Sequence, residues 1–303
     1  MSAGKILKVG GYTIETSNLD KILFPESKIT KGEVIEYYEN ISDYALPYLK
    51  DHPLTMLRCP DGINGQQFIQ KKVSPYFPQW IDRCEVSSKE GTLQQVIINK
   101  KATLVYLANQ ACITYHLYLS KIDKMQYPSY VIFDIDPSTD DLLALKKVVW
   151  HVKKLLDLLE LECFLQTSGS KGFHIYVPLK RIFTFQQTHD FAKDAANYLA
   201  KEYPNEITVK QSKKDRGNRA LIDYARNGYG LSTVAPYSLR AIETAPIATP
   251  IHWDELDEKN IGPRTYNIKN IFNRLNQIQD PWADLLNHKL SIDSAIKKLT
   301  ELM

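Results

Sequence analysis

Two carboxylates one residue apart end an apolar run, and such a pair is suited to divalent-metal chemistry. Asp134 and Asp136 close the segment V-I-F-D-I-D-P-S at residues 131–138. Because successive side chains of a strand point to opposite faces, both carboxylates should share one face while Phe133 and Ile135 pack on the other. Like charges this close repel unless a cation lies between them, and Mg²⁺ or Mn²⁺ takes such hard oxygen ligands. From the pair alone, an Asp-rich strand-to-helix turn is an equally good interpretation.

A loop rich in serine and glycine follows further along the chain. Residues 167–172 read T-S-G-S-K-G and lead into an alternating strand at residues 173–178 that includes His174. Backbone N–H groups, hydroxyls and the point charge of Lys171 together suit a triphosphate. The spacing is not the G-x-x-x-x-G-K-[ST] of a P-loop and no helix follows, so a Walker-type NTPase is not favoured. A plain turn between strands is the alternative, but it leaves Lys171 and His174 unexplained.

A second acidic strand and a downstream arginine make the pattern more specific. Residues 220–224 (A-L-I-D-Y) form an apolar run that carries Asp223, and residues 232–240 (S-T-V-A-P-Y-S-L-R) end in Arg240. Each segment alone is a weak signal. Two acidic strands on either side of a Ser/Gly/Lys loop, with an arginine downstream, indicate a site for a metal ion and substrate phosphates.

These motifs, in this order, resemble the primase-polymerase domain of bacterial and archaeal ATP-dependent DNA ligase D, within the archaeo-eukaryotic primase superfamily. The similarity extends over nearly the whole chain, through S-N-L-D-K, F-P, T-K-G, R-C-P-D-G, Q-K and L-A-N-Q in the same order. The sequence departs from the family at Lys72, where histidine is usual, and at Phe68-Ile69, where some members carry two aromatics. The resemblance implies an α+β fold: a primase-type catalytic core of mixed β-sheets flanked by helices, with an N-terminal flanking subdomain.

The resemblance also implies a function. Such a nucleotidyltransferase would fill gaps and extend 3′ ends at DNA double-strand breaks in non-homologous end joining, with two Mn²⁺ or Mg²⁺ ions and a preference for ribonucleotides. The implied partners are gapped or 3′-overhanging, 5′-phosphorylated DNA ends, NTP or dNTP, Ku and a separate DNA ligase. A metal-dependent nuclease or phosphoesterase and a non-catalytic module that binds DNA ends are the alternatives. The triphosphate-type loop and Arg240 count against the nuclease, and the presence of all three carboxylates counts against the pure binder.

The reaction assigns roles to particular residues. Strand extension requires a 3′-hydroxyl to attack an α-phosphate, and two divalent ions about 4 Å apart can activate the attacker and neutralise the leaving pyrophosphate. The expected catalytic and metal-binding residues are Asp134, Asp136 and Asp223, with Asp223 on the primer side. The expected nucleotide-binding residues are Ser168, Ser170, Lys171, His116, Arg240 and Phe68. By resemblance, the 5′-phosphate across a gap would be bound by Asn18, Lys21 and Lys31.

Several of these assignments depend on the resemblance. Lys31 falls in the first turn of a predicted helix, where free N–H groups and the helix dipole favour an anion. Without the matching motif, Lys21 and Lys31 would be ordinary surface lysines. His116 would be an ordinary core or surface histidine, and Phe68 is equally well explained by core packing or by base stacking.

Length, composition and charge agree with this interpretation. The chain has 303 residues, of which 44% are hydrophobic and 24% charged, and its net charge is +3. No apolar run approaches the roughly 20 residues of a membrane span and no signal peptide is recognisable, so a cytoplasmic, nucleoid-associated protein is expected. The four cysteines form no C-x-x-C pair and should be buried thiols. A basic run at residues 210–219 could contact a template backbone, although a solvated loop is the simpler interpretation.

The elements expected to position these residues form one mixed domain. Helices are predicted at 32–48, after a Thr30/Glu33 capping box, after an acidic cap at 138–141, and at 187–202; strands are predicted at 54–58, 66–71, 130–136, 161–166, 173–178 and 220–224. Residues 1–303 should form a single primase-polymerase domain with a DNA-end-binding part (1–125), catalytic core motifs (126–245) and a helical tail (246–303). Residues 87–101 resemble the family's surface loop that bridges two DNA ends. The chain ends without a long linker, so a stand-alone polymerase is expected.

Overall fold

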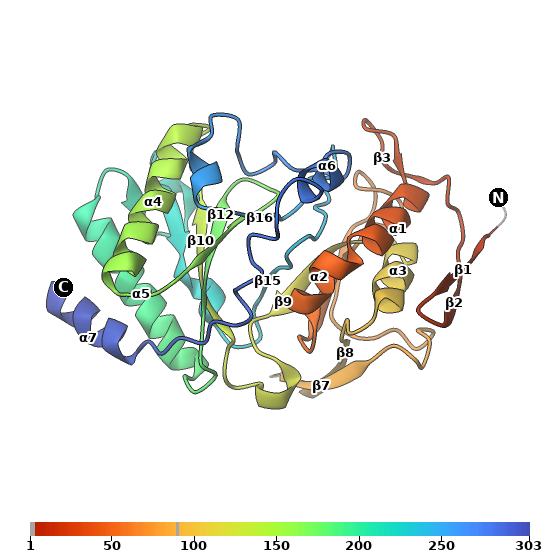
Figure 1. The fold of residues 1–303 in the computed structure, drawn as a ribbon, viewed down its shortest axis with the longest axis horizontal. Helices are drawn as coiled ribbons and strands as arrows, with labels where there is room; N and C mark the ends of the chain where they lie inside the picture. The colour runs from red at the N-terminus through yellow and green to blue at the C-terminus, as the bar shows by residue number, and fades with distance from the viewer. Residues whose placement is uncertain (1–3, 89–90) are drawn as a thin grey trace. The chain divides into compact units, whose positions relative to one another are not determined.

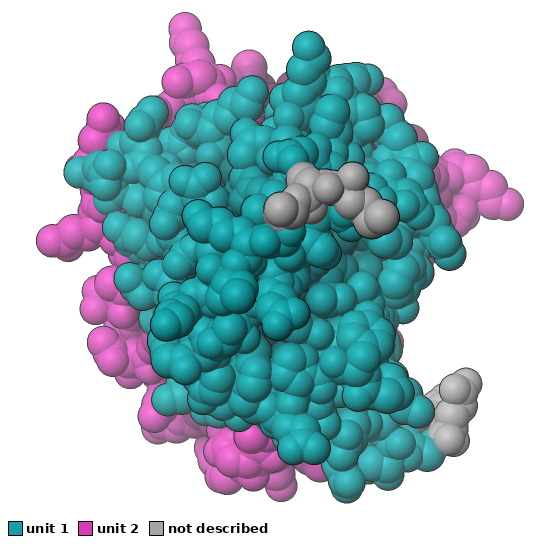
Figure 2. Space-filling model, turned by 90° about the vertical axis from the view of Figure 1, so that its right-hand side faces the viewer, with its two compact units in different colours: residues 1–118, 232–248, 266–276 teal, residues 119–231, 249–265, 277–303 magenta. Residues whose placement is uncertain are grey.

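The chain forms two compact units, each assembled from three segments. The computed structural model describes residues 4–88 and 91–303. Unit 1 comprises residues 1–118, 232–248 and 266–276, and unit 2 comprises residues 119–231, 249–265 and 277–303. Figure 1 follows the chain through its elements, and Figure 2 distinguishes the two units by colour. The α+β class expected from the sequence is confirmed.

Unit 2 is built on a six-stranded mixed sheet in the order β13-β14-β10-β12-β11-β16. Its strands are β10 (Tyr130–Asp136), β11 (Phe164–Thr167), β12 (Phe173–Pro178), β13 (Ile207–Thr208), β14 (Ala220–Asp223) and β16 (Pro250–Ile251). Only β13 and β14 run parallel among these pairs. The long helices α4 (Leu142–Leu158) and α5 (Phe185–Glu202) contact β10 and each other, so they cover the same face of the sheet (Figure 1).

Local capping explains where the helices of unit 2 begin. The carboxylate of Asp141 accepts a hydrogen bond from the N–H of Ala144, so Asp141 caps α4. Ser138, at the start of the expected cap segment 138–141, donates its hydroxyl to the carbonyl of Arg219 at 2.7 Å. The remaining short elements of this unit are η1 (Ile122–Lys124), η2 (Lys213–Asp215), η3 (Tyr224–Asn227), η4 (Asp254–Asp257) and α7 (Asp293–Leu302).

Unit 1 contains a four-stranded antiparallel sheet in the order β15-β9-β5-β6. Its strands are β5 (Leu54–Arg58), β6 (Phe68–Gln70), β9 (Cys112–Tyr118) and β15 (Ser232–Val234). Its helices are α1 (Lys31–Asn40), α2 (Ser42–Leu49), α3 (Lys101–Asn109) and α6 (Ile271–Leu275). Three two-stranded hairpins complete it: β1 (Ile6–Val9) with β2 (Tyr12–Glu15), β3 (Ile22–Phe24) with β4 (Ile29–Thr30), and β7 (Arg83–Ser88) with β8 (Gly91–Val96).

Most predicted elements are confirmed, and one helix needs correction. The strands expected at 54–58, 130–136 and 173–178 have those bounds. The helix expected at 32–48 is two helices: α1 ends at Asn40, α2 begins at Ser42, and Ile41 between them caps both. The Thr30/Glu33 capping box is present in the form that the sequence predicted.

The helical tail expected at residues 246–303 is wrong. Between Ile251 and Met303 only η4, α6 and α7 are helical. Backbone groups there bond to other parts of the chain: the N–H of Ile268 donates to Ala245 O and that of Leu290 to Pro178 O. These segments are also divided between the two units. The linear division into 1–125, 126–245 and 246–303 therefore does not coincide with the compact units.

Three further expectations can be compared with the structure: the state of the cysteines, membrane-spanning helices and the loop at 87–101. All four cysteines are free thiols; Cys59, Cys112 and Cys163 are buried and Cys84 is partly buried. Within the described parts of the chain, no helix is long and apolar enough to cross a membrane. The predicted end-bridging loop at 87–101 covers the end of β7, all of β8 and the approach to α3, and its residues 89–90 lie outside the described residues.

Candidate active site

Strand register brings the acidic side chains of unit 2 together. On β10, Asp134 lies directly opposite Asp223 of β14 on one side and His174 of β12 on the other. Directly opposed residues of an antiparallel pair point to the same face, with Cβ atoms about 5 Å apart. Asp136 is two residues further along the same strand and therefore shares this face. The apolar residues between them, Phe133 and Ile135, are fully buried in the core.

Each oxygen of Asp134 and Asp223 has an assigned neighbour. Asp134 Oδ1 lies 3.3 Å from His174 Nε2, and Asp223 Oδ1 accepts hydrogen bonds of 3.0 Å from Gln211 Nε2 and from the N–H of Ala225. The two Oδ2 atoms face one group, the Nε of Arg226, at 3.4 Å from Asp134 and 3.3 Å from Asp223. The two aspartates therefore share one cation. His174, which a plain turn left unexplained, lies beside these carboxylates.

Asp136 is held differently. Burial raises the pKa of its carboxyl above the usual value, and the nearby charge of Asp134 raises it further, while His174 and Arg216 partly oppose these effects. Among residues 4–88 and 91–303, no three His, Cys, Asp or Glu side chains are arranged as a preformed metal site. Asp134, Asp136 and Asp223 nevertheless offer hard oxygen ligands on one face, and two of them already converge on a cation. Their donor chemistry therefore fits Mg²⁺ or Mn²⁺.

The serine- and glycine-rich loop is folded by its own first serine. Ser168 is buried, and its hydroxyl accepts hydrogen bonds from the N–H groups of Ser170 (3.1 Å) and Gly172 (3.0 Å). A Cβ at Gly172 would lie 1.9 Å from the carbonyl oxygen of Ile135, so only glycine lets the loop approach β10 this closely. Ser168 thus shapes the loop, whereas Ser170 is partly exposed and Lys171 is exposed to solvent.

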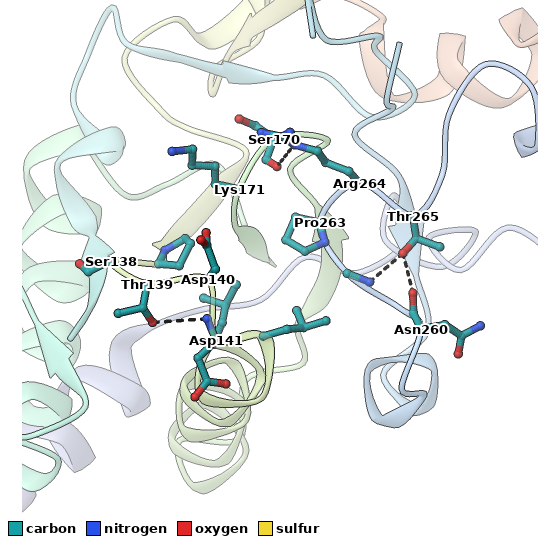
Figure 3. A pocket seen from close by; sticks show the side chains of 14 residues that line it. Ser138, Thr139, Asp140, Asp141, Ser170, Lys171, Asn260, Pro263, Arg264 and Thr265 are labelled. Carbon is teal, nitrogen blue, oxygen red and sulfur yellow. Dashed lines mark hydrogen bonds between the residues drawn. The ribbon is translucent and has the colours of Figure 1, made fainter. Parts of the chain in front are cut away.

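A pocket of about 560 Å³ lies beside this loop. Figure 3 shows Ser170 and Lys171 at the top of the pocket, Asp140 and Asp141 below them, and Arg264 beside Ser170. Arg264 donates its Nε–H to the carbonyl of Ser170 at 2.6 Å. This hydrogen bond ties the loop to residues 249–265, another segment of unit 2. The sequence did not single out Arg264, because nothing local marks an arginine whose contact is so distant along the chain.

The basic run at residues 210–219 is partly structural. Arg216 donates to the carbonyls of Lys210 and Gln211, and Arg219 donates to those of Asp215 and Arg216. These two arginines therefore hold the loop in shape. The remaining cations of the run, Lys210, Lys213 and Lys214, are exposed to solvent.

The three residues expected to bind a 5′-phosphate lie together in unit 1. The N–H of Lys31 donates to Lys21 O at 2.8 Å, and that of Lys21 donates to Asn18 O at 3.0 Å. The Lys31 side chain is buried, and its ammonium donates to the carbonyl of Ser17 at 2.7 Å. Burial, and next the charge of Lys21, lower the pKa of Lys31 to about 8. Lys21 itself pairs with Asp61 at 2.8 Å.

The expected free N–H groups at the start of α1 are not free. Besides the N–H of Lys31, that of Gly32 donates to Leu19 O and that of Glu33 to the Thr30 hydroxyl. The first turn therefore offers fewer free N–H groups to an anion than the sequence suggested.

Phe68, His116 and Arg240 also belong to unit 1. Phe68 is partly exposed on β6, and the guanidinium of Arg58 lies 5.4 Å from its ring centroid. His116 is partly exposed on β9, between Thr55 of β5 and Val234 of β15. Arg240 donates its N–H to Pro246 O. Their nucleotide contacts stay predictions.

Similarity to proteins of known structure and sequence gives the class of the fold. The polymerase domain of Mycobacterium tuberculosis ligase D, solved in complex with DNA, superimposes with a TM-score of 0.85 at 27% identity, over 91% of this chain and 99% of that one. The mixed sheet of unit 2, with the acidic row formed by Asp134, Asp136 and Asp223, thus has a primase-type polymerase fold. Proteins of this class are nucleotidyltransferases.

Sequence similarity then gives the family. The model of the LigD primase-polymerase domain matches residues 30–282, so this chain belongs to that family. The bifunctional non-homologous end joining protein LigD of Bacillus subtilis is 30% identical over 89% of this chain and 44% of its own length. The multifunctional LigD of Mycolicibacterium smegmatis is 31% identical over 90% of this chain and 36% of its own length. The chain therefore spans less than half the length of these relatives.

Proposed function

We propose that this chain catalyses template-directed nucleotidyl transfer that fills gaps and extends 3′ ends at DNA double-strand breaks in non-homologous end joining. The observation that carries the proposal is the pairing of Asp134 with Asp223 across β10 and β14, with Asp136 on the same face. The loop of residues 168–172 connects the neighbouring strands β11 and β12. Carboxylates beside a loop with a lysine are the groups that a metal-bound triphosphate needs. The DNA bound to the M. tuberculosis domain and the end-joining names of the relatives support the same function.

The carboxylates of unit 2 would hold two Mn²⁺ or Mg²⁺ ions, which when bound activate a 3′-hydroxyl and neutralise the leaving pyrophosphate. Asp134, Asp136 and Asp223 supply the oxygens, with Asp223 on the primer side. His174 fixes Oδ1 of Asp134, and Gln211 fixes Oδ1 of Asp223. Each of these carboxylates is thereby oriented with its other oxygen toward the shared cation position.

Phosphate recognition is the second part of the proposal. Ser170 and Lys171 would contact the β- and γ-phosphates from a loop that Ser168 keeps folded. In unit 1, Asn18, Lys21 and Lys31 would bind the 5′-phosphate of a downstream strand. By family resemblance Phe68, His116 and Arg240 would contact the nucleotide, and Ku and a DNA ligase would be partners.

A single assay separates this function from its alternatives. The protein is mixed with a gapped, 5′-phosphorylated duplex, Mn²⁺ and labelled nucleotides. Labelled extension products support a polymerase, shortened DNA indicates a nuclease, and retention of DNA without chemistry indicates a binding module. An Asp223→Ala protein is the control, because it should retain the DNA without extending it.

The same assay tests the choice of sugar. We propose that ribonucleotides are preferred, on the basis of family resemblance and of polar Ser and Thr residues near the proposed site that could hydrogen-bond a 2′-hydroxyl. GTP and dGTP are placed in competition opposite a templating C. A clear preference for dGTP would refute this part of the proposal alone.

A further inference from the structure

Arg226 occupies the position where a cation would bridge two of the carboxylates. Its Nε lies 3.4 Å from Oδ2 of Asp134 and 3.3 Å from Oδ2 of Asp223. Arg226 reaches both from η3, the short 3-10 helix that begins immediately after Asp223 and is capped by that residue's own carboxylate. The position between the two oxygens is thus filled by a protein group whose placement follows from the fold.

This cation has a clear electrostatic reason to be there. Asp134 and Asp223 are directly opposed across antiparallel strands, and like charges in that arrangement repel. Their side chains are only 13% and 10% exposed, so water screens the repulsion poorly. The guanidinium of Arg226 places one positive charge beside both carboxylates and so offsets part of their repulsion.

The same contacts are weak enough to be exchanged. A charge-assisted hydrogen bond from nitrogen to a carboxylate is usually about 2.7–2.9 Å long, and both Arg226 contacts are longer. The same nitrogen, Nε, approaches both carboxylates, so its attraction is divided between two oxygens. The Arg226 side chain is 47% exposed, so water already screens its ion pairs and hydrates the guanidinium when it withdraws.

We propose that Arg226 is an exchangeable counterion of the metal site: it holds Asp134 and Asp223 together in the metal-free protein and must withdraw when a divalent ion binds them. The inference rests on the proposed function, because it takes these carboxylates as metal ligands. Oδ2 of Asp134 and Oδ2 of Asp223 are the atoms that face Arg226.

The proposal makes Arg226 a competitor of the metal in the absence of substrates. Mn²⁺ binding is measured without nucleotide or DNA, from the electron paramagnetic resonance signal of free Mn²⁺. Removal of the guanidinium in Arg226→Gln should tighten Mn²⁺ binding about tenfold, because the ion no longer displaces a like charge from a partly buried site. Arg226→Lys, which keeps a charge on a shorter side chain, should tighten it less. Arg181→Gln is the matched control and should bind Mn²⁺ like wild type, because Arg181 pairs with Asp123 near the other end of β12.

Thermal unfolding gives a second readout that does not involve activity. In EDTA, Arg226→Gln should melt at a lower temperature than wild type, because Asp134 and Asp223 lose their counterion. At saturating Mn²⁺ the difference should disappear, because the guanidinium has already withdrawn in wild type. A deficit of the same size under both conditions would mean that Arg226 supports the fold generally, and would overturn the proposal. If Arg226→Gln does not fold, Arg226→Lys carries both measurements.

The outcomes distinguish this inference from the proposed function. If wild type binds Mn²⁺, Asp134→Asn loses that binding and Arg226→Gln binds no more tightly than wild type, the metal site stands and the counterion proposal is overturned. If Asp134→Asn binds Mn²⁺ as wild type does, the assignment of the metal site fails and the counterion proposal fails with it.

Discussion

The acidic row of unit 2 and the lysine pair of unit 1 are both clusters of like charge, but they are balanced differently. Asp134 and Asp223 share the guanidinium of Arg226, a full opposite charge. Lys31 instead has its ammonium on neutral oxygens, the carbonyl and hydroxyl of Ser17, and its pKa is correspondingly lowered. The acidic row can therefore be stable without its ligand, whereas the buried lysine carries an uncompensated cost that a bound phosphate would relieve.

This difference also concerns how each cluster is held. The carboxylates are fixed by strand register and by His174, Gln211 and a backbone N–H. Lys21 and Lys31 are joined by a backbone hydrogen bond between a turn and the start of α1. We therefore expect the acidic row to control chemistry and the lysines to control the choice of DNA substrate.

The largest effect should come from removal of a carboxylate. Asp134→Ala, Asp136→Ala or Asp223→Ala should each reduce nucleotide addition on the order of a thousandfold or more, because the ligands of both ions are drawn from this set. DNA affinity, measured by fluorescence anisotropy, should remain close to wild type because it depends mainly on lysine and arginine contacts to phosphates. Asp194→Ala, an exposed carboxylate on α5, is the control. Normal extension by Asp136→Ala would show that Asp136 is not one of the metal ligands.

A smaller effect should follow from the loss of the loop lysine. Lys171→Ala should raise KM for nucleotide and lower kcat, with a total loss of about ten- to a hundredfold, the value of one or two charge-assisted contacts. Mn²⁺ affinity without nucleotide should change little, since Lys171 touches none of the carboxylates in the described structure. Lys180→Ala, an exposed lysine just beyond β12, provides the matched loss of charge. Kinetics equal to those of wild type would make the loop purely structural.

The lysine pair should affect substrate choice more than chemistry. In the Lys21→Ala/Lys31→Ala double variant, removing the 5′-phosphate from the downstream strand should no longer weaken gap filling, whereas wild type should lose about tenfold in affinity. On a primer-template without a downstream strand, the variant should extend almost as well as wild type. All comparisons are made at one salt concentration. Equal sensitivity of both proteins to the phosphate would mean that these lysines are ordinary surface residues.

The smallest effect, and the sharpest test of the comparison, is the pH dependence of 5′-phosphate binding. The ammonium of Lys31 has a pKa of about 8 instead of 10.5, and a bound phosphate stabilises its charged form. The affinity gained from the phosphate should be full below pH 8 and should decline as the pH rises above 8, because the proton must then be taken up on binding. A terminal phosphate is already ionised above about pH 7, so it does not produce this change. Lys31→Ala should show no such decline; the same decline in that variant would assign it to another group.

The sequence predicted the parts of the site that follow from local rules. The bounds of β10, the parity of Asp134 and Asp136 and the capping box at Thr30 all depend on neighbouring residues, and all are present. The helix at 32–48 and the tail at 246–303 were predicted less well. The spacing of apolar residues in the tail is typical of a helix. Much of the tail is nevertheless loop, because its N–H groups donate to carbonyl oxygens distant in the chain.

The sequence by itself determined which residues carry charge, which strands bear them and on which face, because side-chain alternation is a property of the strand alone. Only the tertiary structure decided which charges meet. The register of β10 with β14 pairs Asp134 with Asp223, and the turn into η3 brings Arg226 between them. The tertiary structure likewise directs the Ser168 hydroxyl to a backbone N–H of its own loop, and it pairs the first N–H groups of α1 with carbonyl oxygens of the preceding segment. These contacts join residues far apart in the chain or depend on the exact turn between neighbours, and neither composition nor periodicity specifies such geometry.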